Sequence, residues 1–367
     1  MKIKKIKLEN YRNYDQLEID FHKKVNIILG ENGSGKTNLL ESIYLTSLGK
    51  SFRTSKDRDL IKFEREFCRI SSFYVKDNED EEIEIAISNA GKKGIKVNGV
   101  SLKKVSELME NIYIVIFSPE DLKIIKEEPA KRRNFIDREL CQLKISYYNN
   151  LLNYKKVLAQ RNKYLKERYI DDSYLDVWDT ELARYGSKII EERRKFVKEI
   201  NSISKVIHTN ITGKKEEIEI LYKPNISIDL DINKQEEIFY KTLVINRNLD
   251  KQTRITNKGP HKDDIKVLIN NIDARKYGSQ GQQRTAALSL KLSEIELIKR
   301  EKNDNPVLLL DDVMSELDSD RQNYLISSLK DVQIFITTTD LMPDVMDEIS
   351  HGRVVKINKG AYTEIEL

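Results

Sequence analysis

The chain contains little cysteine and histidine. Only two of its 367 residues are cysteines, Cys68 and Cys141, too few for a disulfide framework and without the spacing of a metal site. The four histidines are scattered and form no metal-binding pattern. No apolar run approaches the roughly 20 residues that span a bilayer, and the N-terminal MKIKKIKLENYRNY has no hydrophobic signal region. These absences predict a cytoplasmic protein that does not engage a membrane.

The chain also lacks a strong excess of charge of either sign. Its 64 basic and 60 acidic residues leave a net charge of +4, although the charged fraction, 34%, exceeds the usual level of about a quarter. Composition therefore neither supports nor excludes nucleic-acid binding, which would need local clusters of lysine and arginine. The hydrophobic fraction of 39% is enough for a folded core.

Strands and helices are predicted to alternate at both ends of the chain. The runs IKLEN, LEIDF and VNIILG indicate early strands, and short strands with a turn at Asn98-Gly99 follow between about residues 67 and 100. IYIVIFS, from Ile112, indicates a further buried strand. Alternation returns with a strand at about 265–269, a helix from about Gln282, and the strands VLLL and VQIFITT. We therefore predict one α/β domain built from residues 1–118 and 256–367, with a mostly helical lobe, 119–255, inserted between its halves.

The inserted lobe carries two helical stripes. Apolar residues recur at spacings of three and four from Leu140 to Leu158 and again from Leu175 to Ile207, with a break near residues 171–173. This pattern predicts an antiparallel helical hairpin whose arms of roughly 30 residues would be about 45 Å long. Such a hairpin could project as a coiled coil or pack as an ordinary bundle, and the sequence leaves both open.

A phosphate-binding loop follows the strand VNIILG. GENGSGKT, at residues 30–37, matches G-x-x-x-x-G-K-[ST], and it stands between a strand and a helix as such a loop requires. Its glycines let backbone N–H groups face phosphate oxygens, Lys36 would reach the β- and γ-phosphates, and Thr37 would ligate Mg²⁺. The predicted nucleotide-binding residues here are Gly30, Glu31, Asn32, Gly33, Ser34, Gly35, Lys36, Thr37 and Asn38.

Two carboxylates end the apolar run VLLLDD. Asp311 is predicted to hold Mg²⁺, directly or through water, and Asp312 to orient the attacking water as a catalytic residue with Lys36. Many such ATPases carry glutamate at the second position. Because aspartate is one methylene shorter, we expect slower hydrolysis.

A second glycine loop, at residues 278–282, precedes a helix and the carboxylate strand. About 275 residues separate Lys36 from Asp311, far more than a kinase or GTPase core needs, whereas ABC-type ATPases tolerate such insertions. Those ATPases place a serine loop here that completes the nucleotide site of a partner subunit, which predicts roles for Ser279 (also catalytic), Gly281 and Gln282. The alternative is an ordinary helix cap with Ser279 at the N-cap.

Two further segments match parts of ABC-type ATPases. Residues 315–318, SELD, match the loop that runs along the dimer interface of these ATPases. In ITTTD, Thr338 or Thr339 stands where many relatives have a histidine. Together with Asp312, this departure indicates a slow, switch-like ATPase.

Seven motifs are spread over nearly the whole chain: LENYRNY, GENGSGKTNLLESIY, GKSFR, SPEDLKIIKEEPAKRRNFID, KGPHKDD, YGSQGQQR and LLDDVMSELDSDRQNYL. In these motifs the sequence resembles the RecF family, relatives of the SMC-type ATPase heads. Glu127-Glu128 departs from the small residues that the family tends to have there. The resemblance implies an ABC-type P-loop ATPase head with an inserted helical lobe, ATP and Mg²⁺ as cofactors, and an ATP-dependent homodimer that clamps duplex and gapped or single-stranded DNA. It also implies recombinase loading with RecR/RecO-type mediators, a role in SOS induction, and weak DNA-dependent hydrolysis that releases the clamp.

Clustered basic residues are the candidates for DNA contact. Lys50, Arg53 and Lys56 follow the phosphate-loop helix, and Arg132 and Arg133 open the helical lobe. Basic residues in a lysine-rich chain are usually solvated, and Arg53 and Arg132 could instead serve ATP or interdomain contacts. Two other functions are alternatives to a DNA clamp: a transporter's nucleotide-binding subunit and an SMC-like structural tether. The insert is too short for the arms of a tether.

Overall fold

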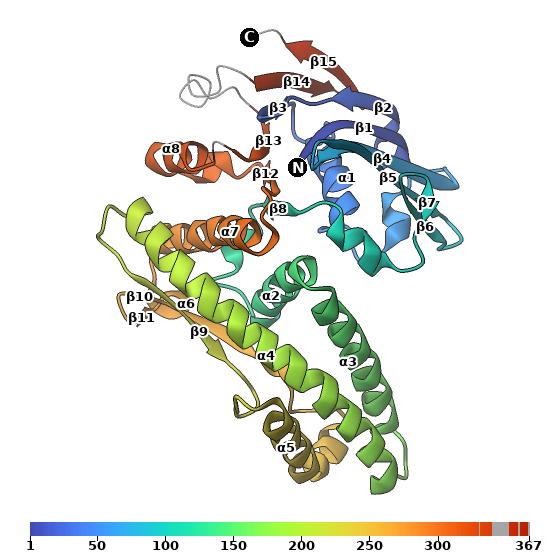
Figure 1. Cartoon of the computed structure of the whole chain (residues 1–367), viewed down its shortest axis with the longest axis vertical. Helices are drawn as coiled ribbons and strands as arrows, with labels where there is room; N and C mark the ends of the chain where they lie inside the picture. Colours follow the sequence, from blue (N-terminus) through green and yellow to red (C-terminus); the bar gives the residue numbers. More distant parts are fainter. Residues whose placement is uncertain (330, 340–351, 359, 366–367) are drawn as a thin grey trace. The chain divides into compact units, whose positions relative to one another are not determined.

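The computed structural model describes residues 1–329, 331–339, 352–358 and 360–365. Contacts divide the chain into unit 1, Met1–Leu122 with Glu294–Leu367, and unit 2, Lys123–Ser293. In Figure 1 the blue and red ends of the chain build unit 1 together, so unit 2 is an insertion. The first boundary lies close to the predicted one at residue 118, but the second lies after Ser293, well beyond the predicted residue 255.

Unit 1 is organised around a six-stranded sheet. Its strand order is β15-β14-β3-β13-β12-β8, and neighbouring strands are parallel except at the β15 edge. The bounds are Ala361–Ile365 (β15), Gly352–Asn358 (β14), Val25–Leu29 (β3), Gln333–Thr338 (β13), Val307–Asp311 (β12) and Ile114–Phe117 (β8). The three strands β8, β12 and β13 are buried along their whole length, which explains why they contain the unbroken apolar runs IVIF, VLLL and IFI instead of an alternating pattern.

Helix α1 (Lys36–Leu48) follows β3 and is almost wholly buried. Its apolar residues are accompanied by three buried hydroxyl groups, each of which donates to the carbonyl three residues earlier: Ser42, Thr46 and Ser47. These bonds satisfy polar atoms that could not otherwise be buried at low energetic cost. The short 3-10 helix Met314–Glu316 and helix α8 (Ser319–Ser327) follow β12.

A second, antiparallel sheet completes unit 1. Its order is β2-β1-β4-β5-β6-β7, with bounds Tyr14–Asp20 (β2), Lys2–Tyr11 (β1), Phe67–Lys76 (β4), Glu79–Ser88 (β5), Lys93–Val97 (β6) and Val100–Ser101 (β7). The predicted turn joins β6 to β7, and both Asn98 (φ 50°) and Gly99 (φ 79°) are left-handed, as a two-residue hairpin turn requires. Single-turn 3-10 helices at Asp57–Leu60 and Asp121–Lys123 and a longer one at Val105–Glu110 lie in the connections.

Four helices build most of unit 2: α2 (Pro129–Leu143), α3 (Ile145–Tyr164), α4 (Asp172–Ile211) and α5 (Ile232–Thr253). The predicted break is where α4 begins, because the Asp171 carboxylate caps it by accepting from Ser173 N over 2.8 Å. The arms are unequal, 20 residues in α3 and 40 in α4, where similar lengths were predicted. No helix in the described part of the chain is long and apolar enough to cross a membrane.

The helical hairpin packs against α5. Phe239 of α5 lies so close to α4 that a Cβ at Gly186 would come within 2.2 Å of its ring, so glycine permits the contact. Leu243 of α5 is buried with it, while Ile245 on the opposite side is exposed. Neither α5 nor the strand before it, β9 (Ile218–Lys223), was predicted from the sequence.

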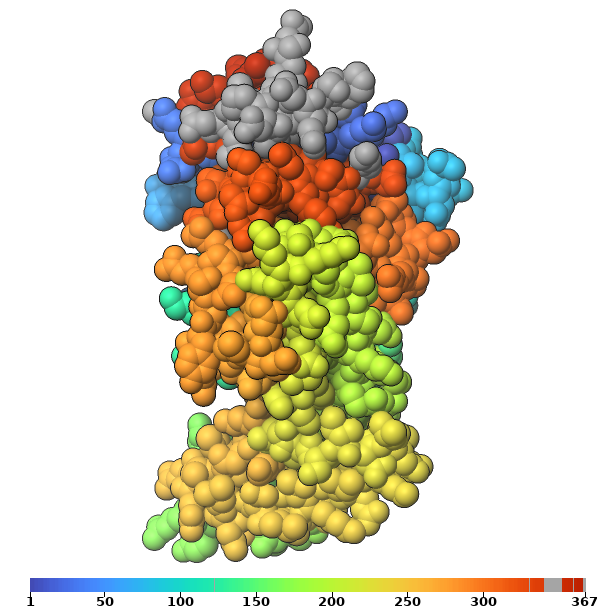
Figure 2. Space-filling model, turned by 90° about the vertical axis from the view of Figure 1, so that its left-hand side faces the viewer, coloured from blue at the N-terminus to red at the C-terminus, as the bar shows by residue number. Residues whose placement is uncertain are grey.

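A small antiparallel sheet explains the late boundary of unit 2. β10 (Asp264–Ile269) pairs with β9 and with β11 (Ile272–Asp273), and Figure 2 shows this light-orange segment beside α4 in yellow-green. Helix α6 (Ala274–Tyr277) follows, and α7 (Gln280–Lys302) begins within unit 2. Ser204 of α4 is 2.7 Å from Ser293 between hydroxyl oxygens, and His208 Nδ1 is 3.0 Å from Ser289 Oγ. Residues 256–293 therefore share a core with the inserted helices.

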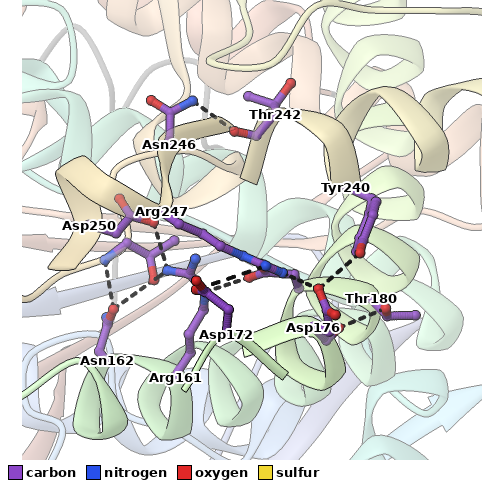
Figure 3. A network of polar contacts seen from close by, with 12 residues as sticks. Arg161, Asn162, Asp172, Asp176, Thr180, Tyr240, Thr242, Asn246, Arg247 and Asp250 are labelled. Atoms are coloured by element: carbon purple, nitrogen blue, oxygen red, sulfur yellow. Dashed lines mark hydrogen bonds and ion pairs between the residues drawn. The ribbon is translucent and has the colours of Figure 1, made fainter. Parts of the chain in front are cut away.

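A network of ion pairs, buried around Arg161 and Asp179, joins α3, α4 and α5 (Figure 3). Arg161 of α3 is fully buried and donates to Asp179 of α4 and to Asp250 of α5, both over 2.7 Å. Arg247 of α5 donates from Nε to the other oxygen of Asp179 over 2.8 Å and also pairs with Asp176. Because each buried carboxylate has a cation, the three helices are held in one arrangement.

Candidate functional site

The GENGSGKT loop lies between β3 and α1, as predicted. Gly35 has φ 119°, and a Cβ there would lie 2.5 Å from Asn13 Nδ2 and 2.8 Å from Tyr14 Oη, so only glycine fits. Asn13 Nδ2 donates to the carbonyl of Ser34, and Tyr14 Oη donates to that of Gly35, both over 3.0 Å. The LENYRNY segment therefore fixes the carbonyls of the loop.

Two buried side chains of the loop are poised for an anion. Lys36 is 4% exposed, and its ammonium donates to the carbonyls of Gly30 (2.6 Å) and Glu31 (3.2 Å). The hydroxyl of Ser34 is buried and has no hydrogen-bond partner among the described residues. A buried hydroxyl without a partner is unfavourable, and an oxyanion in the loop would supply one.

The predicted metal ligands meet although they are far apart in sequence. Thr37 Oγ1 donates to Asp311 Oδ1 over 2.8 Å, and Thr337 Oγ1 donates to the same oxygen over 3.0 Å. The sheet explains the meeting, because β13 lies between β3 and β12 and all three end at the same edge. Burial raises the pKa of Asp311, partly opposed by the two hydroxyl donors. A nearby cation would favour its ionised form.

Asp312 has an unusual backbone. Its φ is 51°, in the left-handed region that aspartate tolerates better than most residues, and its N–H donates to Thr337 Oγ1 over 2.9 Å. Ser315 Oγ donates to the carbonyl of Asp312 over 3.0 Å, and Asp318 caps α8 by accepting from Arg321 N. Hydrogen bonds from the N–H and to the carbonyl of Asp312 therefore fix the turn that follows β12. Thr338 is buried at the end of β13, and Thr339 follows it.

A buried glutamate behind the loop was missed from the sequence. Glu41 of α1 is fully buried and accepts two hydrogen bonds from Arg12, both over 2.8 Å. Arg53 lies 3.8 Å from the same carboxylate and donates to Asn38 Oδ1 over 2.7 Å. Arg12 and Arg53 come from the motifs LENYRNY and GKSFR, which carried the resemblance but received no shared role. Arg53, predicted to contact DNA, is therefore bonded to the phosphate-loop helix, while the exposed Lys50 and Lys56 flank it in sequence.

The second glycine loop lies in unit 2 and forms a reciprocal helix cap. Ser279 Oγ accepts from Gln282 N over 3.2 Å, while Gln282 Oε1 accepts from Ser279 N over 2.9 Å. Ser279, Gln280 and Gly281 are exposed, and Gln282 also donates to Glu216 over 2.9 Å. The helix cap predicted as the alternative is present, and it leaves the serine at the surface. Nothing in the structure explains the choice of glutamine at position 280.

Arg132 and Arg133 differ in their surroundings. Arg132 is 2% exposed and donates to both carboxylate oxygens of Asp264, over 2.6 and 3.0 Å. Its guanidinium is not available to a DNA phosphate in this structure. Because Arg132 and Asp264 both belong to unit 2, their pair is a contact within that unit and does not support the ATP or interdomain contact that the sequence left open. Arg133 is half-buried and donates to the carbonyl of Asp263 over 2.8 Å.

Comparisons with known proteins agree over the whole chain. The family model described as the RecF/RecN/SMC N terminal domain matches residues 2–170. A DNA replication and repair protein RecF from Clostridium tetani is 48% identical over 366 residues, covering 99% of this chain and 100% of that protein. The RecF of Alkaliphilus oremlandii is 46% identical, covering 98% and 99%.

Solved structures extend the agreement to the fold. The recombination mediator protein RecF with ATP, in the RecFOR pathway, matches with a TM-score of 0.92 and 38% identity, covering 100% of this chain and 98% of that one. An Smc head domain derived from Pyrococcus furiosus matches with a TM-score of 0.56 and 17% identity, and thus supports the fold alone. The fold is that of an ABC-type ATPase head of the SMC kind, and the chain belongs to the RecF family of DNA replication and repair proteins.

Proposed function

We propose that this protein binds ATP with Mg²⁺ in the GENGSGKT loop and acts as an ATP-controlled DNA clamp in recombinational repair. The observation that carries the nucleotide site is the Thr37–Asp311 pair, in which a hydroxyl and a carboxylate oxygen lie 2.8 Å apart beside the loop. The partnerless Ser34 hydroxyl fits a phosphate oxygen. The solved RecF with ATP supports the choice of nucleotide.

Thr37 and Asp311 offer few protein ligands, which suits Mg²⁺ better than a metal whose ligands all come from the protein. No group of three or more His, Cys, Asp or Glu side chains able to hold a metal occurs in the described ranges. Mg²⁺ usually takes one or two carboxylates and completes its shell with phosphate and water. Bound there, it would neutralise charge on the phosphate oxygens. Thr37 and Asp311 are the residues that would hold it.

The chain's own groups supply binding and orientation. Lys36 exchanges the carbonyl of Gly30 for phosphate oxygens, which are stronger acceptors for an ammonium group. Arg12 neutralises Glu41, so a buried carboxylate directly behind the loop does not repel phosphate. Asp312 orients the attacking water, and its short side chain makes hydrolysis slow.

The clamp requires a second copy of the chain. Ser279, Gly281 and Gln282 complete the nucleotide site of the partner, so ATP holds the dimer together and hydrolysis releases it. Closure aligns basic side chains, including Lys50 and Lys56, for duplex and gapped or single-stranded DNA. With RecR/RecO-type partners the closed clamp promotes recombinase loading and SOS induction. The description of a solved relative as a recombination mediator in the RecFOR pathway supports this role.

Sedimentation of Ser279→Arg tests the dimer. We expect wild-type protein to dimerise with ATP, and Ser279→Arg to bind ATP equally well but remain monomeric, because the arginine blocks the site of the partner. Ser202→Arg, at an exposed serine of α4, is the matched control and should dimerise. Normal dimerisation of Ser279→Arg would refute the shared site.

A further inference from the structure

Unit 2 contains a cavity that the proposed function does not use. Its volume is about 210 Å³, and it lies among α2, α3, α4 and the GPHKDD turn. Its lining includes the charged side chains Arg133, Lys155, Arg193 and Asp137, together with His261. Three cations therefore face one carboxylate.

The carboxylate and one of the cations already neutralise each other. Arg193, which is 2% exposed, donates to Asp137 over 2.7 Å and to Asp263 over 2.9 Å. Asp137 also accepts from Tyr147 Oη over 2.5 Å. These groups form a closed set of hydrogen-bond partners inside the unit, and in the described part of the chain neither Asp137 nor Asp263 makes an ion pair with Arg133 or Lys155.

Arg133 and Lys155 lack such partners. In the part of the chain that the structure describes, Arg133 donates only to the carbonyl of Asp263 (2.8 Å) and has no carboxylate within 4.0 Å, and Lys155 has no hydrogen bond or ion pair. Burial, and then the charge of Arg193, lower the pKa of Arg133, while the charges of Asp264, Asp263 and Asp137 partly oppose them. An anion beside the guanidinium would relieve both effects.

The histidine in the wall is neutral. Burial lowers the pKa of His261 to about 4. Its Nε2 is 2.9 Å from the carbonyl of Thr256, which can only accept, so Nε2 carries the proton and Nδ1 accepts from Tyr154 Oη over 2.7 Å. Both ring nitrogens are used, and His261 adds neither charge nor a free acceptor to the cavity.

We propose that this cavity is an anion site that takes one phosphate group. The planar fork of Arg133 suits paired phosphate oxygens, and Lys155 adds a point charge at the rim. The cavity is smaller than the roughly 300–1,000 Å³ clefts that enclose whole small-molecule ligands, so it fits the charged group and not a complete nucleotide. The phosphate belongs either to a small molecule or to a DNA strand, and the site is independent of the nucleotide loop.

Calorimetric titration of the full chain with inorganic phosphate, at constant ionic strength, tests the site. Arg133→Gln should weaken one binding event at least about tenfold, because a charge-assisted fork is lost, and Lys155→Gln should weaken it by a smaller factor. Lys156→Gln, an exposed neighbour outside the lining, is the control and should match wild type. The nucleotide loop is identical in all variants, so phosphate bound there contributes equally.

The outcome decides the proposal even if one variant misfolds. Lys155 is exposed, so Lys155→Gln keeps the test valid if Arg133→Gln does not fold. The anion site would be overturned if Lys155→Gln bound phosphate as tightly as the control Lys156→Gln, and if Arg133→Gln, where it folds, did the same.

DNA binding, measured by fluorescence anisotropy with and without phosphate, then identifies the source. If the group is a DNA phosphate, both variants bind DNA more weakly, phosphate competes, and the slope of log affinity against log salt falls by about one. If the source is a small molecule, DNA affinity stays unchanged while phosphate binding is lost. Neither result depends on ATP-dependent dimerisation, so a protein that fails to dimerise with ATP would contradict the proposed clamp without contradicting the anion site.

Discussion

Replacing Arg161 by methionine should destabilise unit 2 strongly. The change removes hydrogen bonds to Asp179, Asp250 and Thr256, of 2.7, 2.7 and 2.8 Å. Asp179 keeps the guanidinium of Arg247, 2.8 Å away. Asp250 is fully buried and keeps only neutral donors from Asn257, so it becomes a buried carboxylate without a cation.

The magnitude follows from that isolated charge. Breaking a buried ion pair by removing one partner costs about 3–5 kcal/mol, whereas an exposed pair contributes about 0–1 kcal/mol. Arg161 Nη2 is itself buried without a partner among the described residues, so the native pair already carries a desolvation cost. Adding Asp250→Asn to Arg161→Met removes the isolated charge, and we expect it to restore at least about half of the lost stability.

The single tryptophan provides the assay. Trp178 lies in α4, with its ring 4.9 Å from that of Tyr164 between centroids, so its fluorescence reports on unit 2. With a urea dependence of about 2 kcal/mol per M, a loss of about 4 kcal/mol lowers the unfolding midpoint by about 2 M. Arg184→Met removes an exposed pair with Glu181 and is the matched control. A loss below about 1 kcal/mol for Arg161→Met, or additive effects of the two changes, would refute the reasoning.

Two other changes test the chemistry of single side chains. Asp312→Asn should retain ATP binding and lose about 100-fold or more in the rate of phosphate release, because the carboxylate that we propose to orient the water is gone. Its ATP-bound dimers should live longer. Unchanged hydrolysis would show that Asp312 does not orient the water. His261→Gln should flatten the pH dependence of stability between about pH 6.5 and pH 4. Below about pH 6.5 the unfolded histidine takes up a proton, whereas the folded one, with a pKa of about 4, does not. The free energy of unfolding of the wild type therefore decreases as the pH is lowered through this window, by up to about 3 kcal/mol. Urea unfolding measures this free energy at each pH. The same pH dependence in the wild type and in His261→Gln would contradict this account.

Most of the α/β framework could be predicted because its signals are local. A strand buried on both faces is mostly apolar, so VNIIL, in which Asn26 is the one polar residue, and VLLL could be recognised from their own residues. The late boundary of unit 2 could not be predicted in this way. It depends on the pairing of β10 with β9, and two short amphipathic strands carry no signal that names their partner.

In the candidate site, too, the residues in local motifs could be predicted and those that depend on distant contacts could not. The loop and its Thr37–Asp311 pair follow from motifs whose spacing is set by backbone geometry and sheet order. Glu41 could not be found, because a glutamate in a helix usually faces solvent and only the fold places Arg12 beside it. Arg132 failed as a surface contact for the same reason, since Asp264 lies far from it in sequence.

The serine loop shows why two explanations that competed at the level of sequence need not exclude each other. A hydroxyl has one donor hydrogen and two acceptor lone pairs. In the cap, Ser279 Oγ uses one lone pair to accept from Gln282 N, and no acceptor for its hydrogen occurs among the described residues. The cap therefore fixes the position of an exposed hydroxyl and leaves its hydrogen available for a phosphate oxygen of another subunit. Ser279→Ala and Ser279→Asp would not separate the two roles, since the first removes both and the second adds charge. Ser279→Arg, by obstructing the partner's pocket, tests the shared site most directly.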